Sequence, residues 1–150
     1  MASAQEVMQL FARQKIEMIS HIPGDTAAND VGWKSMVGYE GFAAIVMATN
    51  LTGNGVTAFS LLVNTAAAGG GTDGTLKEHA VGSAPDATGD YLVLECTAAE
   101  IAQLGSTDGR SYVGISASVT AHNGSDEFAV TYIRWKPTFA YDDLTADYVS

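Results

Sequence analysis

The sequence predicts an all-β fold, an antiparallel β-sandwich of jelly-roll type with one short inserted helix, a short N-terminal helix and an extended C-terminal arm. Short apolar or alternating segments recur along the 150 residues, and turns rich in Gly, Asn and Asp separate them. No long amphipathic segment lies between these strand segments, which argues against a parallel α/β sheet. We expect an N-terminal helix over 1–14, a β-sandwich domain over 15–136 and an arm over 137–150.

The first residues predict a short helix. Ser3 and Glu6 have the spacing of a capping box, in which each side chain bonds the backbone N–H near the other. Val7, Leu10 and Phe11 follow on one helical face. This face is apolar and needs a surface to pack against.

The first half of the predicted domain contains four strand segments. Residues 15–22 alternate between polar and apolar apart from Ile19, and Pro23 ends the segment because proline cannot donate to a strand ladder. A polar loop is predicted over 26–30. The third segment is apolar throughout, which is typical of a strand buried on both faces, and the Asn-Gly pair after it predicts a hairpin to the fourth. The four segments are 15–22, 32–36, 42–48 and 56–64.

The middle of the chain predicts a surface loop, two strands and the inserted helix. The Gly-rich stretch 65–74 predicts the loop, and strands are expected over 76–81 and 91–96. Thr97 and Glu100 then repeat the capping-box spacing. A helix of one to two turns therefore follows the second strand.

The last strands predict a second hairpin. Residues 110–120 alternate between apolar and small polar residues, as expected for a strand with one buried side. An Asn-Gly turn within 122–126 leads to an apolar strand over 128–135. The aromatic residues of 137–150 have no regular period, so this segment is expected to be an arm outside the core.

Composition excludes several classes of function. Seven Lys and Arg against 17 Asp and Glu give a net charge of −10, which disfavours binding to nucleic acid or to an anionic membrane surface. No apolar run approaches the roughly 20 residues of a membrane-spanning helix. One cysteine excludes an internal disulfide, and the first residues lack the pattern of a secretory signal. We therefore expect a soluble acidic protein that is made in a reducing compartment or is indifferent to redox.

No set of residues predicts an active site, a metal centre or a cofactor. Cys96 alternates with Leu92 and Leu94, so its thiol is expected to lie in the core as a small apolar group. The histidines lie far apart in the sequence, without a metal-ligand spacing. Nucleophile, acid and base do not converge at any known spacing, so we expect a protein that is not an enzyme.

The two chain ends are the candidate interaction sites. A sandwich of this length can fill its core without them, and chain ends that contact nothing tend to be polar. Docking on the protein's own domain and docking on a neighbouring chain are both open alternatives. The candidate interaction residues are Val7, Leu10, Phe11, Phe139, Tyr141, Leu144 and Tyr148.

Two motifs carry a family resemblance. Gly38-Tyr39-Glu40-Gly41 opens the apolar strand that runs to Val46, and Gly109-Arg110-Ser111-Tyr112-Val113 leads into the long alternating strand. Over about residues 15–135 the chain resembles small virion proteins encoded in the head-gene modules of tailed bacteriophages. This resemblance implies a capsid decoration (cement) protein, commonly a homotrimer, made in the host cytoplasm. The implied partner is the major capsid protein, on whose outer shell it would sit.

Two alternatives remain open. The protein could act in the neck or tail of a virion, as a connector or a module that faces a receptor. It could also be a carbohydrate-binding sandwich in which Trp33, Tyr39 or Trp135 forms the stacking platform.

Overall fold

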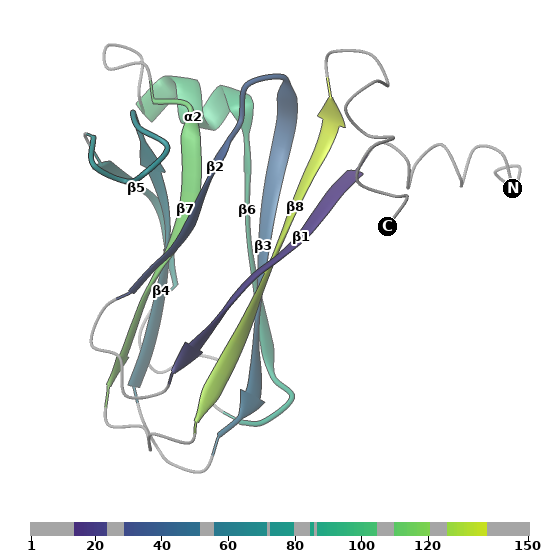
Figure 1. Ribbon diagram of the computed structural model, residues 1–150, viewed down its shortest axis with the longest axis vertical. Coiled ribbons are helices and arrows are strands. Elements are labelled where there is room, and N and C mark those ends of the chain that lie inside the picture. Colours follow the sequence, from purple (N-terminus) through teal and green to yellow (C-terminus); the bar gives the residue numbers. More distant parts are fainter. Residues whose placement is uncertain are drawn as a thin grey trace, which may run out of the picture.

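The protein is an antiparallel β-sandwich in the computed structural model, which describes residues 14–23, 29–51, 56–71, 73–79, 85, 87–104, 110–120 and 126–137 (Figure 1). The predicted all-β class and the inserted helix are confirmed. The predicted N-terminal helix and residues 138–150 of the predicted arm lie outside the described residues. The elements are β1 (Gln14–Pro23), β2 (Asn29–Ser35), β3 (Tyr39–Asn50), β4 (Val56–Asn64), β5 (Asp73–His79), β6 (Tyr91–Thr97), α2 (Ala98–Leu104), β7 (Tyr112–Thr120) and β8 (Glu127–Pro137).

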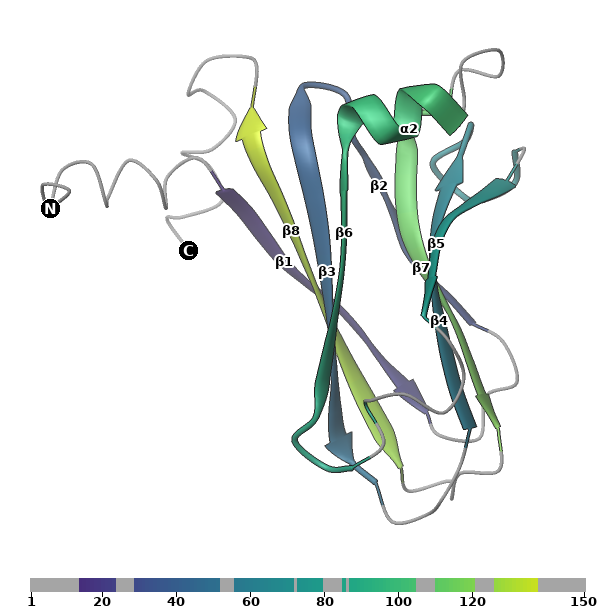
Figure 2. The same ribbon diagram turned by 180° about the vertical axis from the view of Figure 1, so that it is seen from behind.

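The strands form two four-stranded sheets with jelly-roll topology. The first sheet has the order β1-β8-β3-β6 and the second has the order β2-β7-β4-β5. The pairs β1–β8, β2–β7, β3–β6 and β4–β5 are all antiparallel, so the chain forms one long ribbon folded across both sheets. Figure 2 shows the two sheets facing each other, with α2 at the end where β3 begins.

Both hairpins predicted from the Asn-Gly pairs are wrong. β3 and β4 lie in different sheets, and so do β7 and β8. β3 cannot pair with β4 because β8 and β6 already occupy its two edges. The hairpin between consecutive strands instead joins β4 to β5, where Asn64 lies opposite Asp73. The Gly-rich segment predicted as a loop over 65–74 is therefore a hairpin connection that ends at Asp73.

Backbone pairing also explains one break in the alternation and corrects two strand boundaries. The register of β1 shifts between Met18 and Ser20, so Ile19, which broke the alternation, is the extra residue of a bulge. Asn29, predicted as loop, pairs with Ala117 and begins β2. Pro137, assigned to the arm, ends β8 opposite Tyr39.

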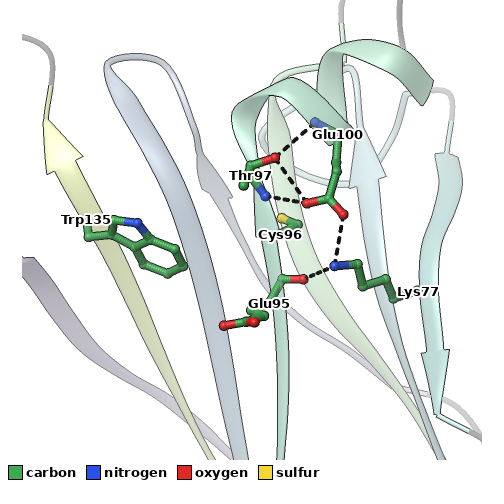
Figure 3. A pocket seen from close by; sticks show the side chains of 6 residues that line it. All are labelled: Lys77, Glu95, Cys96, Thr97, Glu100 and Trp135. Atoms are coloured by element: carbon green, nitrogen blue, oxygen red, sulfur yellow. Dashed lines mark hydrogen bonds and ion pairs between the residues drawn. The ribbon is translucent and has the colours of Figure 1, made fainter.

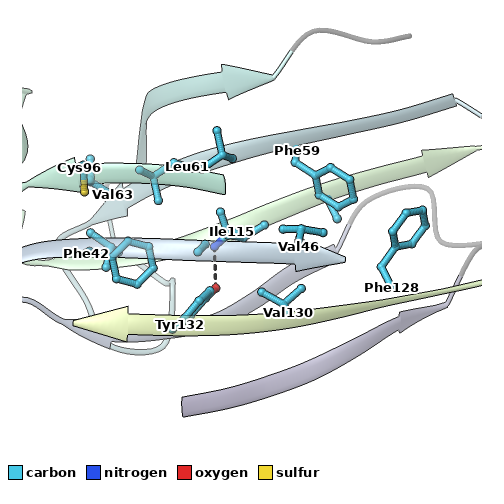
Figure 4. Packing of buried hydrophobic residues seen from close by; sticks show 14 of the residues in the cluster. Phe42, Val46, Phe59, Leu61, Val63, Cys96, Ile115, Phe128, Val130 and Tyr132 are labelled. Atoms are coloured by element: carbon cyan, nitrogen blue, oxygen red, sulfur yellow. Dashed lines mark hydrogen bonds between the residues drawn. The ribbon is translucent and has the colours of Figure 1, made fainter. Parts of the chain in front are cut away.

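The core lies between the sheets and, among the described residues, is built mainly from alternate residues of β3, β4, β6, β7 and β8 (Figure 4). The rings of Phe42 and Tyr132 pack edge to face with their centroids 4.9 Å apart. The rings of Phe59 and Phe128 pack in the same way with their centroids 5.5 Å apart. All four rings are fully buried. Aromatic pairs of this kind add about 0.5–1.5 kcal/mol beyond the burial of their area.

Tyr132 links the two sheets through a buried hydrogen bond. Its hydroxyl accepts the backbone N–H of Ile115 at 2.8 Å, which joins β8 of the first sheet to β7 of the second. We expect Tyr132→Phe to lower the free energy of unfolding by about 1–3 kcal/mol, because it leaves that buried N–H without this acceptor. Urea denaturation followed by circular dichroism measures the loss, and an unchanged midpoint would contradict it.

Polar links close both open edges of the sandwich. Where β1 faces β2, Arg134 Nη2 lies 2.9 Å from Glu17 Oε2, and Arg134 Nη1 donates to the Ser35 carbonyl at 2.7 Å. Where β5 faces β6, Lys77 Nζ lies 3.0 Å from Glu100 Oε1. These links hold the sheets together where the apolar core reaches solvent.

Candidate functional site

The structure describes two candidate surfaces, a pocket at the β6 edge and the outer face of the first sheet. The interaction residues predicted from the sequence lie outside the described residues, so that prediction stays open. Those residues are Val7, Leu10, Phe11, Phe139, Tyr141, Leu144 and Tyr148. Of the described helices, none is long and apolar enough to cross a membrane.

The pocket has a volume of about 300 Å³ and an aromatic wall (Figure 3). Trp135 of β8 reaches across β3 above Gly41, where a Cβ would lie 2.1 Å from the indole Cε2. Glycine at this position therefore allows the indole to lie flat on the outer side of the sheet. The lining residues are Lys77, Glu95, Cys96, Thr97, Glu100 and Trp135.

A capping box holds Glu100 at the pocket. The Thr97 N–H donates to Glu100 Oε2 at 2.8 Å, and the Glu100 N–H donates to Thr97 Oγ1 at 3.2 Å, as the sequence spacing predicts. The Thr97 N–H and then the Lys77 ammonium lower the pKa of the Glu100 carboxyl. Glu100 is therefore ionised at neutral pH and can accept hydrogen bonds but cannot donate a proton.

Cys96 is one of the residues at the pocket, but its thiol is buried and inert. The side chain is 2% exposed and points into the core, which confirms its predicted orientation. Burial, followed by the negative charge of Glu100, raises the pKa of the thiol to about 12. Since the thiolate is the nucleophile, this cysteine is unreactive at neutral pH.

We expect the folded protein to resist alkylation at Cys96. At pH 8 iodoacetamide should label the native protein at least about 100-fold more slowly than the protein unfolded in guanidinium, because burial keeps the thiol protonated. Mass spectrometry measures the labelling. The thiol pKa rises from 9.0 to about 12 on folding, so its contribution to stability is full below pH 9 and falls as the pH rises toward 12. Rapid native labelling would contradict this environment.

The proposed stacking platforms differ in their surroundings. Trp135 lines the pocket. Trp33 covers Gly114 on the outer side of the second sheet and also contacts Gly69. The Arg134 guanidinium covers one face of the Tyr39 ring at 4.5 Å. Among the described residues, no group of three or more His, Cys, Asp or Glu is arranged to hold a metal ion.

The outer side of the first sheet carries an unusual apolar surface. Three rows of paired residues cross it: Ile16–Ile133–Ala43–Glu95, Thr131–Ile45–Val93 and Ala129–Met47–Tyr91. Large side chains in these rows are open to solvent: Tyr91 is 65% exposed, Ile16 53%, Val93 44% and Met47 42%. We call these rows the outer apolar face.

The outer side of the second sheet is more polar. Ser116, Ser60 and Glu78 form one of its rows, and Thr75 lies opposite Leu62 in another. An antiparallel sheet with one solvated side is expected to alternate in this way. The apolar run over 42–48 did signal that β3 is apolar on both sides. The neighbours of β3 on this face could not be identified from the sequence, because only the strand register places them there. These neighbours include Tyr91, Val93 and Ile16.

Comparisons with known proteins show no family for this chain. No protein-family model matches the sequence, and no curated protein matches it. A chain from the Bacillus endospore appendages, which form disulfide-linked pili, is 16% identical with a TM-score of 0.44 over 83% of this chain and 87% of that one. Pseudomonas aeruginosa AlgX is 13% identical with a TM-score of 0.46 over 81% of this chain and 27% of that chain. Likenesses this distant carry no argument about function.

Proposed function

We propose that the protein is a non-catalytic structural component of a phage virion, a decoration protein that binds the outer surface of the head. Its partner is the major capsid protein, and its segments 1–13 and 138–150 make the contacts. Jelly rolls are common both in viral capsid domains and in lectins. The fold is therefore compatible with this role but does not distinguish it from carbohydrate binding. The two phage-like motifs of the sequence support this choice.

One structural observation supports the proposal most directly: both chain ends leave from one end of one sheet. Gln14 at the start of β1 lies opposite Trp135, and Pro137 at the end of β8 lies opposite Tyr39. Val37, which is 71% exposed, lies in the turn between β2 and β3, next to Tyr39 at this end. The helix α2 lies at the same end of the sandwich (Figure 1). Segments that start together can engage one partner surface together, and such multivalent contact raises affinity without a deep pocket.

Removal of residues 138–150 tests this attachment. Virions that lack the protein are mixed with the full-length protein or with the truncated one, and bound copies are measured after particle sedimentation. We expect truncation to lower occupancy at least about tenfold, because it removes one of two linked contacts. The control is Ser60→Glu on the outer side of the second sheet, which should bind normally. Unchanged occupancy of the truncated protein would exclude the C-terminal segment from attachment.

Copy number distinguishes the head from the neck or tail. A shell protein is present in on the order of hundreds of copies per particle, whereas a neck or tail ring has about six or twelve, because closed symmetry limits its copies. Quantitative mass spectrometry of purified virions measures this number. Absence of the protein from virions would refute a structural role in the particle.

The pocket favours carbohydrate binding as a second candidate function. The exposed side of the Trp135 ring could stack on a sugar, and Glu95, Thr97 and Lys77 bring polar atoms to the same pocket. A glycan array followed by titration of tryptophan fluorescence tests this, with Trp135→Ala expected to abolish binding. Trp33→Ala is the matched control because Trp33 does not line the pocket. Absence of any bound glycan would dismiss this function.

A further inference from the structure

We infer that the outer apolar face of the first sheet is the contact surface between two copies of this protein. The inference is independent of the proposed capsid role, since it concerns how the protein assembles with itself. It uses a surface distinct from the chain ends to which attachment is assigned.

The outer apolar face has the composition of a buried surface, although it lies on the exposed side of the sheet. The described side chains of its three rows are apolar except for Thr131 and Glu95. β3 has no strongly polar side chain on either side between Phe42 and Ala48, a pattern typical of strands buried on both sides. In the single chain one of those sides is solvent-exposed at Met47. A second protein layer would complete its burial.

Charge favours a second copy as that layer. The chain has a net charge of −10, so most approaches between two copies are repulsive. The outer apolar face carries one charged side chain among those described, Glu95, which lies in the row at its α2 end. Two copies therefore meet with the least like-charge repulsion when these faces contact each other. The described side chains on the outer side of the second sheet form no comparable apolar surface.

The size of the face predicts a weak contact. The three rows hold ten residues, each covering about 4.8 Å by about 6.7 Å of the sheet, and together they give on the order of 300 Å², the size of the larger patches found on monomeric proteins. Two faces bury about 600 Å², well below the roughly 1,200 Å² of the smaller stable interfaces.

Sedimentation velocity of the full-length protein tests the inference over about 1–200 µM, the range in which a contact of this size should form. We expect the mass to rise above 15.6 kDa with concentration. Met47→Glu should weaken association at least about tenfold, because it places an unpaired charge within the apolar contact. Val93→Lys should weaken it as well, although this change makes the net charge less negative.

Ser60→Glu is the matched control, because it adds the same charge on a central strand of the other sheet. It should increase general repulsion slightly and leave the association largely intact. Met47 and Val93 are exposed in the single chain, so their variants should retain the wild-type melting temperature, which circular dichroism checks.

Three results would overturn the inference. One is a wild-type monomer throughout the concentration range. Another is an oligomer unaffected by both Met47→Glu and Val93→Lys. The third is a monomer whose binding of the dye ANS rises when residues 138–150 are removed, which would show that the chain's own C-terminal segment covers the face. Failure of self-association would leave the capsid proposal standing, since particle occupancy tests that separately.

Discussion

Replacement of Phe42 by alanine is expected to lower the free energy of unfolding by about 3–5 kcal/mol, the largest effect of any single change considered. Phe42 is 0% exposed, and its ring contacts Tyr132 edge to face between the sheets. Its removal leaves a cavity that paired strands on both sides of β3 cannot collapse to fill. The expected fall in melting temperature is roughly 10 °C.

Chemical denaturation of Phe42→Ala and Val37→Ala provides the comparison. Val37 is 71% exposed, so its truncation should change the free energy of unfolding by no more than about 0.5 kcal/mol. Phe42→Leu should fall between the two because it retains part of the buried volume. If Phe42→Ala cost less than about 1 kcal/mol, the described core packing would be wrong.

Replacement of Glu17 by alanine is expected to cost about 2–4 kcal/mol, because it leaves the buried Arg134 guanidinium without its counter-ion. The Arg134 side chain is 9% exposed, and that of Glu17 is 21% exposed, which places the expected loss below that of a fully buried pair. Arg134 would retain the Ser35 carbonyl and the Tyr39 ring as partners. These do not neutralise its charge.

A double-mutant cycle separates the loss of the ion pair from a loss of packing. Glu17→Met combined with Arg134→Met should be more stable than Glu17→Met alone, because no unpaired charge remains buried. Glu78→Ala, at an exposed carboxylate on β5, serves as the control and should change stability by no more than about 0.5 kcal/mol. Additive losses at Glu17 and Arg134 would show that the pair contributes no coupling across the β1–β2 edge.

The candidate surfaces depended on information at two levels. The capping box of Thr97 and Glu100 and the inward orientation of Cys96 follow from spacing along one element, and the structure confirms both. The pocket could not be predicted, because Trp135 of β8 and Glu95 of β6 line one pocket across β3 only in the folded sheet. The outer apolar face could be predicted in part: the apolar sequence of β3 indicated it, whereas its neighbouring residues on β1, β6 and β8 follow only from strand pairing.

The sequence by itself determined roughly where strands form, the inward side of the alternating strand β7 and where α2 begins, because alternation and capping are local properties of the chain. The tertiary structure alone decided which strands pair. An Asn-Gly turn reverses the chain whether the next strand joins the same sheet or crosses to the other. The choice depends on which edges are occupied, and β8, some 80 residues beyond β3, occupies an edge that β4 would need. Strands that pair over so long a stretch of chain carry no local sequence pattern that identifies their partner. The strand order, and with it the set of residues that lie beside β3 on the outer face, is therefore fixed only by the folded structure.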